Sequence, residues 1–339
     1  MPTSNSASDA RKCAPAFGCY LRLIVDLAAA FTERYGEEAW EIMKNIAHRI
    51  GQERTPRLRE RFNIDPTDAR SIVNILAFET AVFLSSPDDY KLIELTRNRK
   101  VARVFSCAQA EECRRLPDMC MRFFDYIDQA TYEELGVKIK RYDVPLRIAK
   151  GDPYCETILE IEGDDDGRAA EGVSGTAELP KFDMPIQTKI RLVQNSYMRI
   201  IVDMAIAFTG RWGEDAWEIL KGISYRIGQE RAPRLQQRFN IDPTDLRSIN
   251  QYIEFESTVF LSRPEDYKLP ELTQKRKVEH ILSCSQAGQL KRCPDLCMRF
   301  LDYMEQGTLD TLGVKMKRYE VPLRISKGDA YCETIIEIE

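Results

Sequence analysis

The chain has 339 residues, of which 43% are hydrophobic and 30% charged, and its formal net charge is −5. This composition is typical of a soluble globular protein with enough residues for two domains, and it argues against a disordered chain. No basic run is long enough to follow a phosphate backbone. No apolar run approaches the ~20 residues that span a bilayer, so neither nucleic acid nor a membrane is an expected partner.

The start of the chain gives no sign of export. Residues 1–19 have neither the apolar stretch of a secretion signal nor the arginines of a transit peptide, and they predict a flexible tail. The chain contains ten cysteines but is large enough to be stable without disulfides. We therefore expect a cytoplasmic protein whose thiols are free or bound to a metal.

Two helices are predicted after this tail. From Tyr20, apolar residues recur at helical spacing as far as Gly36, a residue type that commonly ends a helix. Residues 37–62 then predict a second amphipathic helix. Because proline removes a backbone donor, this helix is expected to be interrupted or kinked near Pro56.

A strong start signal predicts a third helix. Asp65 is expected as its N-cap, with Pro66 at the first helical position and Asp68 three residues beyond the cap. After this helix the hydrophobic period changes. Residues 90–107 alternate, which predicts a hairpin or one long strand broken at residues 97–99.

The last segment of this pattern mixes a helix with two strands. Residues 117–136 return to helical spacing, and residues 137–162 predict two strands joined across Lys150–Asp152. Helices therefore come first and strands mostly later. This order predicts an α+β fold in which an antiparallel sheet is covered on one face by helices.

The whole pattern occurs twice. Residues 20–162 align with residues 197–339 without a gap, and about two thirds of the positions are identical. The intervening residues 163–183 are acidic and then rich in Gly, Ala and Ser, as linkers are. We therefore predict a flexible tail, a first unit over residues 20–162, a linker, and a second unit over residues 184–339. The natural arrangement is a fused dimer with a pseudo-two-fold axis, and further homo-oligomerisation stays open.

Neither histidine belongs to a feature that both copies share. His48 aligns with Tyr225, and His280 aligns with Arg103. A nucleophile activated by histidine, or a histidine-rich zinc site, is therefore excluded as a feature built identically in each unit.

Three cysteines per copy do match. Cys107, Cys120 and Cys155 each stand at the end of a predicted element, where side chains converge at the rim of a sheet; they align with Cys284, Cys297 and Cys332. Three thiols meeting there, with an acid or water as the fourth ligand, could hold zinc or an iron–sulfur cluster. They could equally be buried structural thiols, or include a nucleophile. A helix N-terminus would lower the pKa of Cys120 and favour its thiolate.

The other candidates in each copy are one glutamate and one arginine. Glu79, matched by Glu256, lies within an apolar helical run, so it faces either solvent or a buried site that would raise its pKa and suit a general acid or base. Arg147, matched by Arg324, could bind a substrate carboxylate, although a solvated strand face would explain it as well.

These features together resemble the L-2-amino-thiazoline-4-carboxylic acid hydrolase family. The resemblance is carried by the run "ERYGEEAWEIMKNIAHRIGQERTPRL", by the elements that bear Cys107 and Cys120, and by the closing strand "KGDPYCETILEIE"; the second copy ends on "KGDAYCETIIEIE". That strand is also similar to vinyl-4-reductase type sensor domains, in which cysteines and an acid hold zinc. Arg147 and Arg324 stand where those domains would have another cysteine.

The hydrolase resemblance implies opening of a small ring that contains a C=N bond, by addition of water. Glu79 and Glu256 would then transfer the proton, and the cysteines would supply the nucleophile or the metal ligands. The alternative is a sensor or interaction module that binds a metal or small ligand through its cysteines without turnover. In either case the expected partner is a small molecule, and zinc or an iron–sulfur cluster is the only cofactor to consider.

Overall fold

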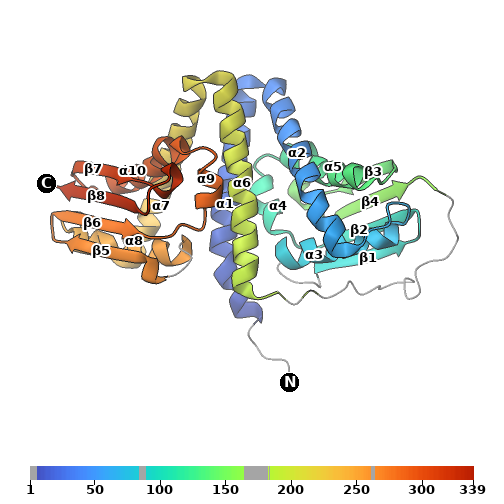
Figure 1. Ribbon diagram of the computed structural model, residues 1–339, viewed down its shortest axis with the longest axis horizontal. Helices are drawn as coiled ribbons and strands as arrows, with labels where there is room; N and C mark the ends of the chain where they lie inside the picture. Colours follow the sequence, from blue (N-terminus) through green and yellow to red (C-terminus); the bar gives the residue numbers. More distant parts are fainter. Residues whose placement is uncertain (1–5, 84–88, 164–181, 183, 261–263) are drawn as a thin grey trace. The chain divides into compact units, whose positions relative to one another are not determined.

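The computed structural model of the chain describes residues 6–83, 89–163, 182, 184–260 and 264–339. Nearly all of the predicted linker, residues 163–183, lies outside these ranges. By its internal contacts the chain forms two compact units, Met1–Gln194 and Asn195–Glu339. Each unit contains helices and a four-stranded antiparallel sheet, so the expected α+β fold with two similar domains is confirmed (Figure 1).

The first unit begins with three helices and continues with strands and short helices. Its elements in chain order are α1 (Ser6–Tyr35), α2 (Glu37–Phe62), α3 (Ala69–Phe83), β1 (Tyr90–Leu95), β2 (Arg99–Val104), α4 (Ala108–Cys113), η2 (Cys120–Phe124), α5 (Asp125–Leu135), β3 (Ile139–Leu146), η3 (Ile148–Lys150) and β4 (Cys155–Ile161). The strands lie in the order β1-β2-β4-β3, and β1 and β2 form the predicted hairpin.

The second unit repeats this order. Its elements are α6 (Ile186–Trp212), α7 (Glu214–Phe239), α8 (Leu246–Phe260), η4 (Pro264–Asp266), β5 (Tyr267–Leu272), β6 (Arg276–Ile281), α9 (Ala287–Leu290), η5 (Cys297–Leu301), α10 (Asp302–Thr311), β7 (Met316–Leu323), η6 (Ile325–Lys327) and β8 (Cys332–Ile338). The sheet order β5-β6-β8-β7 is the same as in the first unit.

One face of each sheet is covered by helices and is apolar over much of its area. In the first unit Leu159 and Ile161 of β4 pack with Leu58 of α2, Ile72 of α3 and Leu135 of α5 in one buried cluster. The opposite face carries charged pairs that cross the strands, such as Arg103 Nε with Glu156 Oε2 at 2.7 Å. The alternation of the strand sequences produces this division, because successive side chains point to opposite faces.

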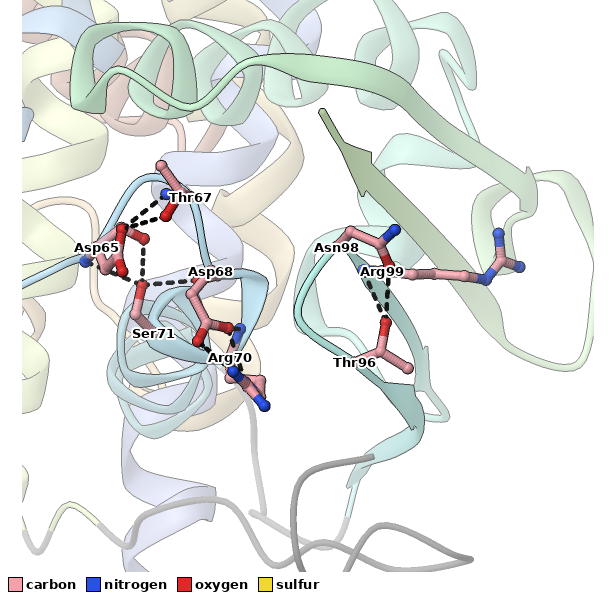
Figure 2. Close-up of polar contacts among 8 residues, drawn as sticks. All are labelled: Asp65, Thr67, Asp68, Arg70, Ser71, Thr96, Asn98 and Arg99. Atoms are coloured by element: carbon pink, nitrogen blue, oxygen red, sulfur yellow. Dashed lines mark hydrogen bonds and ion pairs between the residues drawn. The ribbon is translucent and has the colours of Figure 1, made fainter. Parts of the chain in front are cut away.

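The third helix starts later than its sequence predicts. Asp65 does not cap it: Asp65 Oδ1 accepts hydrogen bonds from the backbone N–H and the hydroxyl of Thr67, which closes a turn before the helix. The capping residue is Asp68, whose Oδ1 accepts the backbone N–H of Arg70 at 2.9 Å (Figure 2). An aspartate can bond either the turn or the helix start, and the sequence does not say which of two aspartates does which.

Two other expectations differ from the structure. Helix α1 begins at Ser6, within residues 1–19 that are predicted to be a flexible tail. Helix α2 continues without interruption through Pro56 as far as Phe62. Pro56 lacks the N–H that would bond the Gln52 carbonyl, so the helix loses one backbone hydrogen bond there without ending.

Gly36 directly follows the first helix, as its sequence predicts. It has a φ of 58°, which favours glycine, and its N–H donates to the Thr32 carbonyl at 2.9 Å. No helix among the described residues is both long enough and apolar enough to cross a membrane.

Candidate functional site

The helix-facing side of the first sheet is apolar at one end and polar at the other. The register of β2 against β4 places three pairs on this face: Lys100 with Leu159, Ala102 with Thr157, and Val104 with Cys155. Paired residues of antiparallel strands project on the same side of a sheet. The face therefore runs from the apolar cluster around Leu159 to a thiol at Cys155.

The three cysteines predicted from the repeat lie at this polar end. Cys107 directly precedes α4, Cys120 is the first residue of the π-helical turn η2, and Cys155 begins β4. Cys107 lies near enough to Cys120 and Cys155 to interact with both electrostatically. Cys155 and Cys120 interact in the same way. The backbone N–H of Ile148 donates to Cys155 Sγ at 3.3 Å. The fold thus gathers thiols that lie far apart along the chain.

A fourth thiol, Cys113, was not predicted. It ends α4, is fully buried, and donates a hydrogen bond to Cys120. Comparison of the two copies does not point to it, because the aligned residue in the second copy is Leu290. We call Cys107, Cys113, Cys120 and Cys155 the thiol cluster.

Within the thiol cluster only Cys120 is activated. The hydrogen bond from Cys113 lowers the pKa of the Cys120 thiol, and the charges of Arg147 and Lys150 add to this effect against the cost of burial. Burial raises the pKa of Cys107 to about 11 and also raises the pKa of Cys155. Cys120 is therefore the thiol of the cluster that ionises most readily.

The second unit lacks this activation. Cys297 begins η5 and Cys332 begins β8, as Cys120 and Cys155 begin their elements, whereas Cys284 lies between β6 and α9. Burial raises the pKa of all three thiols, that of Cys297 to about 11. Leu290 replaces the Cys113 donor, and Ser326, which lowers the pKa of Cys297, does not offset burial, so the two units have the same scaffold but different thiol chemistry.

Arg147, expected to bind a substrate carboxylate, already has a carboxylate partner. It is only 7% exposed, and its guanidinium forms a two-point ion pair with Asp125 at the start of α5, with Nη1 to Oδ1 at 3.3 Å. Its backbone N–H donates to Asp152 Oδ2 at 2.7 Å. Arg324 and Asp302 repeat this pair in the second unit. Arg147 contributes a positive charge beside Cys120, and the Asp125 carboxylate acts in the opposite direction.

Glu79 is one of several half-buried charged groups. Arg54 of α2 donates from Nη1 to Glu79 Oε1 at 2.7 Å and from Nη2 to Asp128 Oδ1 at 2.8 Å. Burial, with the nearby Asp128 carboxylate adding to it, raises the pKa of Glu79 to about 7, although Arg54 acts in the opposite direction. We call Arg54, Glu79 and Asp128 the ion network.

The second unit builds the same network from Arg231, Glu256 and Glu305. Arg231 lies 2.8 Å from Glu256 and 2.7 Å from Glu305. Burial raises the pKa of Glu256 to about 7. The structure takes neither of the two orientations that the sequence leaves open for this glutamate in full: the side chain is half-buried, with 23% of it exposed at Glu79 and 24% at Glu256.

Helix α5 connects the ion network with the thiol cluster. Asp125 and Asp128 lie one turn apart on it, and the Tyr142 hydroxyl of β3 donates to Asp128 Oδ2 at 3.4 Å. Burial raises the pKa of the Tyr142 hydroxyl, and the charges of Asp128 and Asp125 raise it further. Polar groups thus extend from Glu79 through Asp128 and Asp125 to Arg147 beside Cys120.

The predicted metal ligands are the six matched cysteines, all of which lie within the described residues. No three or more His, Cys, Asp or Glu side chains there are arranged so that they could hold an ion. Instead the Cys120 thiol is hydrogen-bonded to Cys113. The zinc or iron–sulfur hypothesis stays a prediction, and no chemical step below depends on it.

Comparisons with protein-family models, with curated proteins and with solved structures find no match for this chain. The interpretation of the site therefore depends on its own geometry.

Proposed function

We propose that the chain hydrolyses a carbon–nitrogen or related bond in a small sulfur- or nitrogen-containing ring, and that the first unit carries the reaction. One observation supports this most directly. The Cys120 thiol has a lowered pKa, and the Glu79 carboxyl has a pKa of about 7. Both residues belong to one connected set of polar groups. A nucleophile and a group able to give and take a proton near neutral pH are what such a hydrolysis needs.

The reaction would proceed by displacement at the carbon of the ring C=N bond. The Cys120 thiolate forms a bond to this carbon, the bond from carbon to the leaving ring atom breaks, and that atom takes the proton of Glu79. Water then gives a proton back to the Glu79 carboxylate and displaces the sulfur. One water is consumed, and the thiolate and the protonated glutamate are restored.

The residues around these two groups would have supporting roles. Arg147 and Lys150 hold the thiolate form of Cys120 by their charge, and Cys113 does so by its hydrogen bond. Arg54 keeps the Glu79 carboxyl oriented. The resemblance to the L-2-amino-thiazoline-4-carboxylic acid hydrolases supports the same class of substrate.

Turnover of L-2-amino-thiazoline-4-carboxylate by the purified chain tests this proposal, with ring opening followed by mass spectrometry. Cys120→Ser should lower kcat by ~100-fold or more, since the nucleophile is lost. Glu79→Gln should lower it by ~100-fold as well, since the proton transfer is lost. The matched variants Cys297→Ser and Glu256→Gln in the second unit should keep most of the activity. Absence of turnover in the wild type, or full activity of the Cys120→Ser and Glu79→Gln variants, would refute the proposal.

The alternative is a module that binds a metal or small ligand without turnover, and the proximity of several thiols favours it. Elemental analysis and a visible spectrum of protein purified without oxygen distinguish the two. Stoichiometric zinc or an iron–sulfur absorbance, lost in Cys120→Ser, would support the alternative.

A further inference from the structure

Two polar side chains in the first unit are buried without a partner. Lys100 of β2 is 0% exposed, and its Nζ has no hydrogen-bond partner among the described residues. The hydroxyl of Tyr90, on the neighbouring strand β1, is buried and unpartnered in the same way. Glu79 and Asp128 are near enough to act on Lys100 by charge, but both are bonded to Arg54. A buried ammonium without a bond is costly, so these two groups indicate a missing acceptor.

The second unit shows what that acceptor is. Lys277, which aligns with Lys100, is equally buried, and although its Nζ likewise makes no hydrogen bond of regular geometry, it forms an ion pair with Glu279 Oε2 at 2.5 Å. Tyr267, which aligns with Tyr90, has its hydroxyl 3.1 Å from the same oxygen. One carboxylate from the chain itself therefore serves both groups in the second unit.

In the first unit the residue at this position is Ala102. It is 1% exposed and projects on the same face of β2 as Lys100, because the two residues are two positions apart. Tyr90 pairs with Val104, so Ala102 lies between the lysine and the tyrosine along the strand. Relative to glutamate, alanine lacks a methylene and a carboxylate, which are the atoms of an acetate ion.

We propose that the first unit binds the carboxylate group of a small ligand between Lys100 and Tyr90, at the place that the Glu279 carboxylate fills in the second unit. The ligand's carboxylate accepts from the ammonium of Lys100 and from the hydroxyl of Tyr90. The second unit is closed to such ligands by its own side chain. Lys100, rather than Arg147, is then the residue that recognises a carboxylic acid.

The inference names the ligand class of the proposed function and rests on it only for turnover. Binding of a carboxylate can be measured whether or not the chain is a hydrolase. If ring opening fails but acetate binds as described below, the anion site stands and the hydrolase proposal falls. If ring opening succeeds but acetate does not bind there, the hydrolase proposal stands and the anion site falls.

Acetate is the probe that matches the missing atoms, and acetamide is its uncharged counterpart. Isothermal titration calorimetry should detect acetate binding to the wild-type chain with a dissociation constant on the order of 1 mM, as expected for so small a ligand. Acetamide, and sodium chloride at equal ionic strength, should not bind. Ala102→Glu copies the second unit and should abolish acetate binding, and Lys100→Met should do the same.

The reciprocal variant makes the test decisive. Glu279→Ala should open a second site, so that roughly twice the heat is released at saturation, since two equivalent sites are filled. The double variant Ala102→Glu/Glu279→Ala should bind through its second unit alone. Circular dichroism checks that each variant is folded, and Glu279 already shows that this scaffold accepts a glutamate there. No acetate binding to the wild type, or binding that Ala102→Glu leaves unchanged, would overturn the inference.

Discussion

Glu256 is subject to two opposing influences, burial, which favours its neutral form, and the Arg231 guanidinium, which favours its carboxylate. The outcome is a pKa of about 7 in the folded chain, against an ordinary value of 4.5. Between these two values the folded chain binds more protons than the unfolded chain. The free energy of unfolding therefore falls as pH rises through this window.

Replacing this glutamate should remove part of that pH dependence. The wild type should be stabilised relative to Glu256→Gln at pH 5 and should lose roughly 1–3 kcal/mol of this advantage by pH 8, as the raised pKa requires. Urea unfolding of both proteins at pH 5, 6, 7 and 8 measures it. Glu254→Gln changes an exposed residue of the same helix and is the control. Parallel stability curves for wild type and Glu256→Gln would contradict the raised pKa.

The sequence could predict Glu79 as a candidate but not its surroundings. A glutamate within an apolar helical run is conspicuous, whereas Arg54 and Asp128 lie in stretches full of charged residues. Lys100 was missed for the same reason, because its strand alternates charged with apolar residues and predicts a solvated face. Only the register of β2 on β4 shows that Lys100 faces the helices.

At the level of elements, the closest approach of two helices in each unit depends on small residues. A Cβ on Gly228 of α7 would lie 2.1 Å from the Met304 carbonyl oxygen and 2.9 Å from the Thr308 nitrogen, both in α10. Gly51 has the same role in α2, where a Cβ would meet the Ile127 carbonyl oxygen at 2.6 Å. Since these contacts are with backbone, a larger residue must move a whole helix.

Two alanine substitutions in α7 separate this contact from helix propensity. Gly228→Ala should destabilise the chain by about 1–3 kcal/mol or more, because the added methyl group overpacks the helix interface. Gly222→Ala lies in the same helix with no atom within 4 Å of the new Cβ. It should stabilise the chain by ~0.5–1 kcal/mol through helix propensity alone. Urea midpoints measure both, and equal effects would show that the helices do not touch at Gly228.

The helices and strands themselves were largely predictable, because apolar residues recur at different spacings in helices and in strands, and residues such as Gly36 mark where an element ends. Ends set by competing side chains were not. Asp65 and Asp68 have equal capping ability, and only their hydrogen bonds show that the second begins α3. The π-helical turn at Cys120 also has no sequence signal of its own, although it helps to place this thiol.

At the level of the whole chain, the two copies retain one scaffold and differ where chemistry would occur. The first unit has an unpaired lysine and an activated thiol, whereas the second has Glu279 on its lysine and Leu290 in place of the donor thiol. Both differences act in the same direction. Under the two proposals above, both differences assign ligand binding and reaction to the first unit.

The thiol difference predicts unequal reactivity within one molecule. At pH 7.5 iodoacetamide should label Cys120 at least ~10-fold faster than Cys297, because only the thiolate reacts and its fraction follows the thiol pKa. Cys113→Leu removes the donor and should slow the labelling of Cys120 towards that of Cys297. Leu290→Cys adds a donor to the second unit and should speed the labelling of Cys297. Mass spectrometry of tryptic peptides over time follows both sites in the same sample, so each chain is its own control. If Cys113→Leu left the rate at Cys120 unchanged, access to solvent rather than the hydrogen bond would determine reactivity, and the assignment of Cys120 as the activated thiol would fail.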